Sequence, residues 1–114
     1  MVSSINSSSQ ALRAFDTGIA VTANNIANVE SDNFKSSRTV MNEGNNGGVK
    51  VSLSKNSADG PLVTQSNGTT KELSNTDLAT EFTSMINYQS AYGANVKTIQ
   101  TDDEMKGTIL NMKA

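Results

Sequence analysis

The sequence predicts a mainly α-helical chain in which long N- and C-terminal helices form a coiled-coil-like pair around a small β-hairpin insertion. Apolar residues recur every seven positions in both end segments, which is the spacing of a coiled-coil seam. The middle segment alternates apolar and polar residues, as a half-buried β-strand does. We therefore expect one structural domain in three parts: a helix over residues 1–29, a loop with a small hairpin over 30–75, and a helix over 76–114.

The N-terminal helix is predicted from an apolar series near the start of the chain. Ser3 or Ser4 is suited to cap its first turn, because a short side-chain oxygen can accept a hydrogen bond from an unpaired helical N–H. At the second apolar position of the heptad, polar residues replace apolar ones in two of the repeats, so the apolar seam is interrupted. Its apolar members are Ile5, Leu12, Ile19 and Ile26, with Phe15 and Val29 three residues after two of them.

The C-terminal helix carries a stronger pattern over about residues 77–112. Asn75 or Thr76 is a plausible N-cap, and Asp77 in the first turn complements the helix dipole. Near the end of the helix the apolar face drifts to Met105, Ile109 and Met112. The main seam series is Leu78, Met85, Tyr92 and Ile99, flanked by Phe82, Val96 and Leu110.

The middle of the chain predicts one small hairpin. Val49, Val51 and Leu53 alternate with polar residues after a turn-forming Asn-Asn-Gly-Gly stretch, and a second short strand is expected near residues 62–65. An isolated hairpin is marginally stable in water, so we expect this segment to be mobile or to dock on neighbours.

The composition predicts a chain that depends on partners for its stability. Ser, Thr, Asn and Gln supply 45 of the 114 residues, and the aromatic residues are three Phe and two Tyr. Ordering each residue opposes folding by roughly 1–2 kcal/mol, which burial of apolar surface must offset. So few large apolar side chains are a weak basis for a monomeric core.

Several functional classes are disfavoured by what the sequence lacks. It has no cysteine and no histidine, which removes thiolate chemistry and the commonest general base and metal ligand. The acidic run at 102–104 spreads around a helix and predicts a solvated face. A net charge of −2 without a basic stripe disfavours nucleic acid. No membrane span and no cleavable secretory signal are visible. We expect no catalytic residues, no metal and no cofactor.

An asparagine cluster near the end of the first helix needs an explanation, because Asn is a poor helix former. In the stretch TANNIANV, Asn24 and Asn28 are four apart and share a face, while Asn25 points elsewhere. We interpret the cluster as a polar contact that sets register between subunits. The alternative is that one of these residues simply ends the helix in the left-handed conformation that Asn tolerates.

Gly18 and Gly93 lie inside the two predicted helices, where each is destabilising by up to about 1 kcal/mol relative to Ala. Close approach of another backbone, from the partner helix or a neighbouring subunit, would account for them. Simple tolerance of glycine is the alternative.

The two ends of the chain together resemble one family. TANNIANV followed by ESDNFKSSRTVM is similar to the N-terminal signature of the bacterial flagellar axial rod and hook proteins, including the pair Phe34-Lys35. Residues 74–113 resemble the matching C-terminal signature. Family members often carry Gly where this chain has Asn33, a residue that also tolerates the left-handed conformation. The length of the chain is similar to that of proximal rod proteins, whereas its C-terminal sequence resembles those of hook and distal-rod proteins.

The resemblance implies a structural subunit of the flagellar rod in the basal body, the drive shaft that crosses the periplasm. It implies polymerisation through the terminal helices, partners among other axial proteins, and passage through the flagellar type III export apparatus without a cleaved signal. The alternatives are a coiled-coil adaptor or export chaperone, and a shortened hook/rod junction paralogue. The assembly contacts are predicted at Ile5, Leu12, Phe15, Ile19, Asn24, Asn25, Ile26, Asn28, Leu78, Phe82, Met85, Tyr92, Val96 and Ile99.

Overall fold

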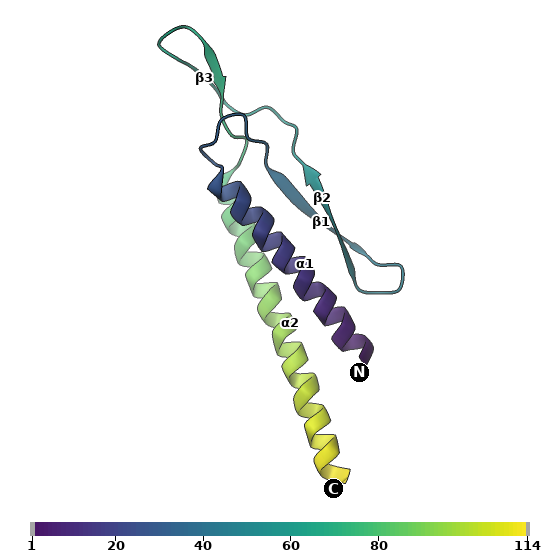
Figure 1. Ribbon diagram of the computed structural model, residues 1–114. Helices are drawn as coiled ribbons and strands as arrows, with labels where there is room; N and C mark the ends of the chain where they lie inside the picture. Colours follow the sequence, from purple (N-terminus) through teal and green to yellow (C-terminus); the bar gives the residue numbers. More distant parts are fainter. Residues whose placement is uncertain (1, 114) are drawn as a thin grey trace.

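The computed structural model describes residues 2–113 as a long, thin molecule with extents of 80 × 25 × 13 Å. Two antiparallel helices, α1 (Val2–Ala27) and α2 (Leu78–Lys113), form its body, and both termini lie toward the same end (Figure 1). Two separate hairpins connect the helices: β1 (Ser37–Glu43) with β2 (Val49–Lys55), and β3 (Leu62–Thr64) with β4 (Thr70–Glu72). The predicted fold class is confirmed.

The ends of the helices differ in detail from the prediction. Ser3 and Ser4 both lie inside α1 instead of capping it. The N-cap of α2 is Asp77, not Asn75 or Thr76: its Oδ1 accepts a hydrogen bond from the N–H of Ala79 at 3.1 Å. A carboxylate at this position satisfies an otherwise unpaired N–H and also stabilises the positive end of the helix dipole.

The two helices meet along a seam of small and polar residues. Three contacts mark it: Ser4 Oγ donates to Asp102 Oδ2 at 3.0 Å, Gly18 lies against the ring of Tyr88, and Asn25 Nδ2 donates to Glu81 Oε2 at 3.1 Å. Successive partners are separated by multiples of seven on both helices, in opposite directions. The helices therefore pair with a regular coiled-coil register, although few large side chains fill the seam.

Burial follows the same seam. On α1 the most buried residues are small or polar. Among the described residues, the hydrophobic residue that is fully buried is Ala14, at 1% exposure. No described side chain of α2 is fully buried. The buried polar residues of the body are Ser8, Thr22 and Asn25. The structure is thus consistent with the expectation that burial of apolar surface within one chain is slight.

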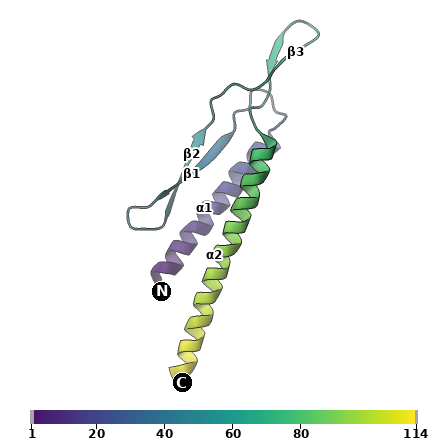
Figure 2. The same ribbon diagram turned by 180° about the vertical axis from the view of Figure 1, so that it is seen from behind.

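The β1–β2 hairpin runs beside α1, with its loop directed toward the end that carries the termini (Figures 1 and 2). The predicted strand at Val49–Leu53 is present, but it pairs with residues 37–43, which the sequence did not single out, and not with residues 62–65. Thr39, Met41 and their partners Leu53 and Val51 share one face. The single predicted hairpin is therefore two hairpins.

The β3–β4 hairpin projects from the opposite end of the molecule (Figure 1). It is short, with three residues in each strand, and joins the body through the loop before β1. The N–H of Asn33 donates to the carbonyl of Glu72 at 3.0 Å, and Asn33 has φ = 57°. The left-handed turn expected at Asn33 is therefore present.

Candidate assembly interface

Asn25 joins three elements inside the subunit. Its side-chain oxygen accepts from the N–H of Ser37 at 2.9 Å, and its Nδ2 donates to the carbonyl of Ser37 at 2.6 Å. The same Nδ2 also donates to Glu81 of α2. The amide thus pairs with the outer edge of β1 as another strand would, and at 1% exposure it is inaccessible to a second subunit. Asn25 holds β1 onto the helix pair.

The other two asparagines lie at the helix end. Asn28 Nδ2 donates to the carbonyl of Asn24 at 2.9 Å, and Asn28 Oδ1 accepts from Ser31 Oγ at 3.0 Å. Because the backbone N–H of Asn28 also donates to the carbonyl of Asn24, at 3.2 Å, the backbone and side chain of Asn28 together close the last turn of α1 and link it to Ser31. Asn24 is exposed and lines the groove between α1 and β2.

The predicted apolar contacts of α1 flank the seam instead of filling it. Ile5, Leu12, Phe15, Ile19 and Ile26 are all half-buried. Phe15 packs near Tyr88, with ring centroids 6.4 Å apart. Ile19 lies two residues from both Thr17 and Val21, which face the hairpin side, so it points about 200° away from them around the helix.

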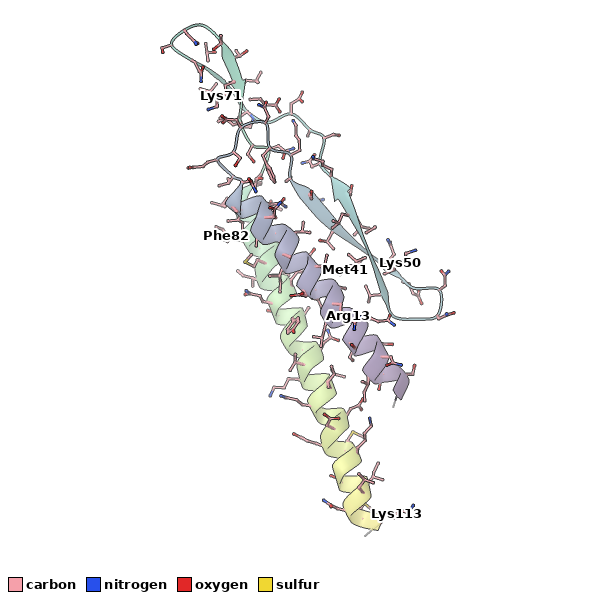
Figure 3. All side chains as sticks on the ribbon, viewed as in Figure 1. Arg13, Met41, Lys50, Lys71, Phe82 and Lys113 are labelled. Atoms are coloured by element: carbon pink, nitrogen blue, oxygen red, sulfur yellow. The ribbon has the colours of Figure 1, made fainter. Side chains whose placement is uncertain are left out.

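The predicted contacts of α2 are more exposed. Leu78, Phe82 and Tyr92 have 39%, 49% and 38% of their surface in solvent, while Met85, Val96 and Ile99 are half-buried. Phe82 is labelled in Figure 3. It lies two residues from both Thr80 and Ser84, which line a small cavity beside β1, and so points away from the hairpin.

The two helical glycines have different surroundings. A Cβ built on Gly18 would lie 2.9 Å from the ring of Tyr88, so glycine permits this ring to reach the α1 backbone. A Cβ on Gly93 meets nothing within 4 Å. Close packing at Gly93 therefore requires a second molecule.

Lys35 of the Phe-Lys signature anchors the base of the second hairpin. Its ammonium group donates to Glu72 and to the carbonyl of Ala58, and it lies 3.6 Å from Asp59. The hydrogen bond from Lys35, helped by one from the N–H of Gly60, lowers the pKa of Glu72 below its usual value. The same bond to Glu72 raises the pKa of Lys35. Both partners are therefore held in their charged forms.

Asn75, which the sequence predicts only as a helix cap, connects three loops through hydrogen bonds. Its Oδ1 accepts from the N–H of Ser36 at 2.7 Å, and its Nδ2 donates to the carbonyls of Asn56 and Ala58 at 3.0 and 2.8 Å. Apart from the position of an amide next to a helix start, no sequence pattern indicates this role.

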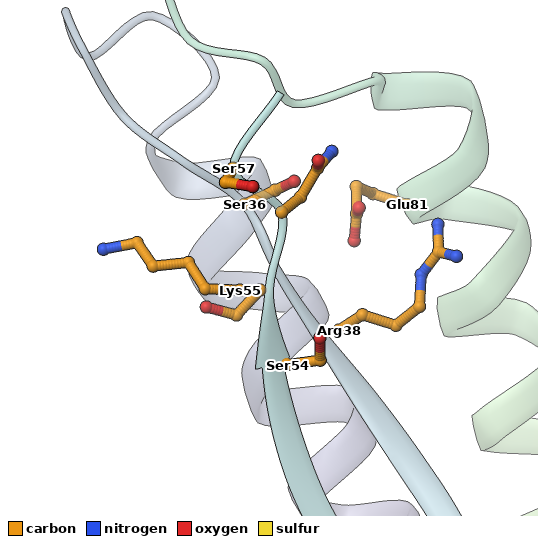
Figure 4. Close-up of a pocket in the computed structure, with 8 residues that line it drawn as sticks. Ser36, Arg38, Ser54, Lys55, Ser57 and Glu81 are labelled. Carbon is orange, nitrogen blue, oxygen red and sulfur yellow. The ribbon is translucent and has the colours of Figure 1, made fainter. Parts of the chain in front are cut away.

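A polar cavity of about 340 Å³ lies between the base of the first hairpin and α2 (Figure 4). Arg38 of β1 and Glu81 of α2 both line it, together with the hydroxyls of several serines. Among the described residues there is no cluster of potential metal ligands, and neither described helix carries an apolar window long enough to span a bilayer.

Comparison with known proteins places these elements in a family. The model for the flagella basal body rod protein matches residues 5–35, which are α1 and the turn with the Phe-Lys pair. The model for the flagellar basal body rod FlgEFG protein C-terminal region matches residues 68–112, which include α2. The chain belongs to the flagellar rod and hook protein family. Membership in this family supports a role for the chain as a structural component of the flagellum.

One curated relative shows how little of a larger protein this chain spans. The flagellar hook protein FlgE of Treponema pallidum (strain Nichols) is 39% identical over 75 residues. The match covers 66% of this chain but 15% of the hook protein. The family resemblance seen at both ends of the sequence is thus confirmed.

Proposed function

We propose that this chain is a structural subunit of the flagellar rod, polymerising through its terminal helices. The observation that carries the proposal is the position of the family's two terminal segments: they form one helix pair whose large apolar side chains remain half exposed. Several large apolar side chains left exposed along one helix, such as Leu78, Phe82 and Tyr92, are typical of an interaction site. The proposed location is the basal body, and the partners are further copies, other axial proteins and the type III export apparatus.

The charge distribution supports a contact between copies of the chain. No charged residue occurs in residues 17–29 of the first segment or in residues 82–96 of α2. Copies of these stretches can therefore approach one another without like-charge repulsion, which would destabilise an interface between identical chains. Ile19 and Phe82, which point away from the hairpin, lie in these two stretches.

The short insertion favours the rod over the hook. Fifty residues separate α1 from α2, and they form two small hairpins without a core of their own. The hook relative is much longer than this chain. A contact that uses different faces of each subunit does not close, and so generates a filament.

The test is complementation of a strain that lacks the protein, followed by imaging of isolated basal bodies. Ile19→Asp and Tyr92→Asp place a charge on the proposed surface and should abolish incorporation and motility while the chain is still expressed. Thr101→Asp is the matched control, because Thr101 is exposed, lies outside the uncharged stretch and on the opposite face of α2 from Tyr92, and its hydroxyl bonds within α2, to the carbonyl of Lys97. Normal motility with both of the first two variants would contradict the proposal.

Two other functions make different predictions in the same experiment. A coiled-coil adaptor or export chaperone would form a fixed small oligomer and be absent from basal bodies. A shortened hook/rod junction paralogue would be present in few copies at one level of the axial structure. Open-ended growth, or many copies along the rod, supports the rod subunit.

A further inference from the structure

The β3–β4 hairpin exposes apolar side chains where nothing in its own subunit covers them. Leu62 is 68% exposed and Val63 is 45% exposed. The β4 side of the hairpin is held by the hydrogen bond from Asn33 to Glu72, but the outer edge of β3 is open. Residues 62–70 carry no charge. This hairpin is therefore a small, uncharged projection with a free strand edge.

A groove of matching character lies on the side of the molecule. It has a volume of about 400 Å³ and is lined by α1 residues, among them Ala20 and Val21, together with Leu53 of β2. Leu53 is 62% exposed although its strand packs against α1.

The outer edge of β2 borders this groove and is also open. The bonds from Gly44 to Gly48 and from Asn56 to Ser36 fix which backbone groups of β2 face β1, so those of Val51 and Leu53 face outward. An open edge of this kind can accept another strand.

The projection and the groove cannot meet within one chain. The two hairpins point in opposite directions along the long axis, so β3–β4 extends away from the groove of its own subunit (Figures 1 and 2). Lys71, the charged residue among 62–71, forms an ion pair with Asp32 of its own subunit at 2.6 Å, and Asp16 is the charged residue among those lining the groove. The projection is therefore close to neutral, and the match between the two surfaces lies in their apolar centres and open strand edges.

We propose that the groove between α1 and β2 receives the β3–β4 hairpin of a second copy of this chain. The inference rests on the proposed polymerisation and adds a contact outside the terminal helices. Because the projection and the groove are different surfaces at different levels of the molecule, the contact is head-to-tail and does not close. It would cover Leu53, Leu62 and Val63 and give both open strand edges a neighbour.

The absence of cysteine makes the contact testable by disulfide cross-linking. Leu53→Cys and Leu62→Cys variants are co-expressed in a strain lacking the wild-type chain, and isolated basal bodies are oxidised and run on a non-reducing gel. A dimer should form in the assembled material because a disulfide needs the two Cα atoms within about 7 Å. The matched control replaces Leu53→Cys with Ser52→Cys, which lies on the opposite face of the same strand. Ala20→Cys is a second groove position, in case Leu53→Cys impairs folding.

The outcomes separate this contact from the function on which it rests. A dimer with Leu53→Cys or Ala20→Cys, and at least fivefold less with Ser52→Cys, supports the pairing. Basal bodies that contain both variants but show no dimer above the control would overturn the pairing and leave the rod function standing. Protection of the L53C thiol from a maleimide without a dimer would assign the groove to another protein, which also overturns it. Absence of the chain from basal bodies would overturn both.

Discussion

Asn25 replaces a strand at the edge of β1, since an amide side chain offers one acceptor and two donors in nearly the geometry of a peptide group. Both backbone groups of Ser37 are satisfied by it, and Glu81 takes the remaining donor. The asparagine cluster thus divides by function. Asn25 is an internal contact, Asn28 completes the helix end, and Asn24 remains on the surface.

Asn25→Asp tests this internal role. The substitution keeps the shape but removes the donors and places a carboxylate beside the carbonyl of Ser37 and the carboxylate of Glu81. We expect a loss of about 3 kcal/mol in the free energy of unfolding, because the Ser37 carbonyl loses its donor and a buried negative charge then faces it and Glu81. Denaturant unfolding followed by circular dichroism measures it. Asn24→Asp is the control and should lower the free energy of unfolding by less than about 1 kcal/mol. Equal losses in the two variants would show that the hydrogen bonds of Asn25 contribute no more to stability than a residue on the surface.

The two glycines give a paired prediction. Gly18→Ala forces the ring of Tyr88 to move and should destabilise the chain by about 1 kcal/mol, despite the better helix propensity of Ala. Gly93→Ala meets open space and should stabilise the isolated chain by up to about 1 kcal/mol. In thermal unfolding, the midpoint should be lower for Gly18→Ala and higher for Gly93→Ala than for the unsubstituted chain.

Gly93→Ala also tests whether a neighbouring subunit packs at this glycine. If it does, the variant should assemble less well even though the isolated chain is more stable, which basal-body yield would measure. Unchanged assembly would mean that glycine at position 93 is merely tolerated.

At the scale of elements, the heptad spacing was enough to predict both helices, because periodicity depends on many residues. It did not identify the residues that meet. The predicted series supplied flanking residues such as Ile19 and Tyr92, whereas the seam runs through Gly18, Asn25 and Glu81. Hydrophobic patterning gives weight to large apolar side chains, and close contact through small or polar ones leaves no such signal.

Strand pairing was harder to predict than strand position. Residues 37–43 mix Arg, Asn and Glu with apolar residues and give a weak alternation, so β1 was missed. Its pairing depends on Asn25, which is distant in sequence, and on the tight turn where Gly47 and Gly48 have positive φ. Lys35 and Asn75 were missed as loop anchors for the same reason: their partners are 37 and 39 residues away.

The Lys35–Glu72 contact makes the attachment of the second hairpin dependent on pH. Because the pKa of Glu72 is lowered on folding, its contribution is fully present above the usual value of about 4.5 and is lost as pH falls through the lowered pKa. The pKa of Lys35 is raised, so its contribution is lost only in strong base. We expect amide exchange at Gly60, corrected for the intrinsic pH dependence, to be steady from pH 7 to 5 and to accelerate below that range.

Glu72→Gln is the control for this pH dependence. It keeps an oxygen that can accept from Lys35 and Gly60 but cannot titrate, so protection at Gly60 should be weaker at pH 7 and should not change further in acid. A profile identical to that of the unsubstituted chain would show that another group controls the attachment.

At the scale of the whole molecule, the chain is 80 Å long and its helix pair has a seam without large buried side chains. A chain with so little internal burial gains much of its order when it binds neighbours, since ordering entropy must be offset by contacts somewhere. Such a subunit can remain loosely folded when free and become rigid in an assembly.

Amide exchange in the free chain should therefore be uneven and largely fast. At low micromolar concentration we expect measurable protection around Asn25, Ser37 and Glu81, where three elements are hydrogen-bonded, and rapid exchange toward both ends of the helix pair, where opening is nearly free. In isolated basal bodies the same end segments should become at least tenfold slower, because neighbours cover them. Slow exchange throughout both helices of the free chain would show that the polar seam suffices to stabilise a monomer.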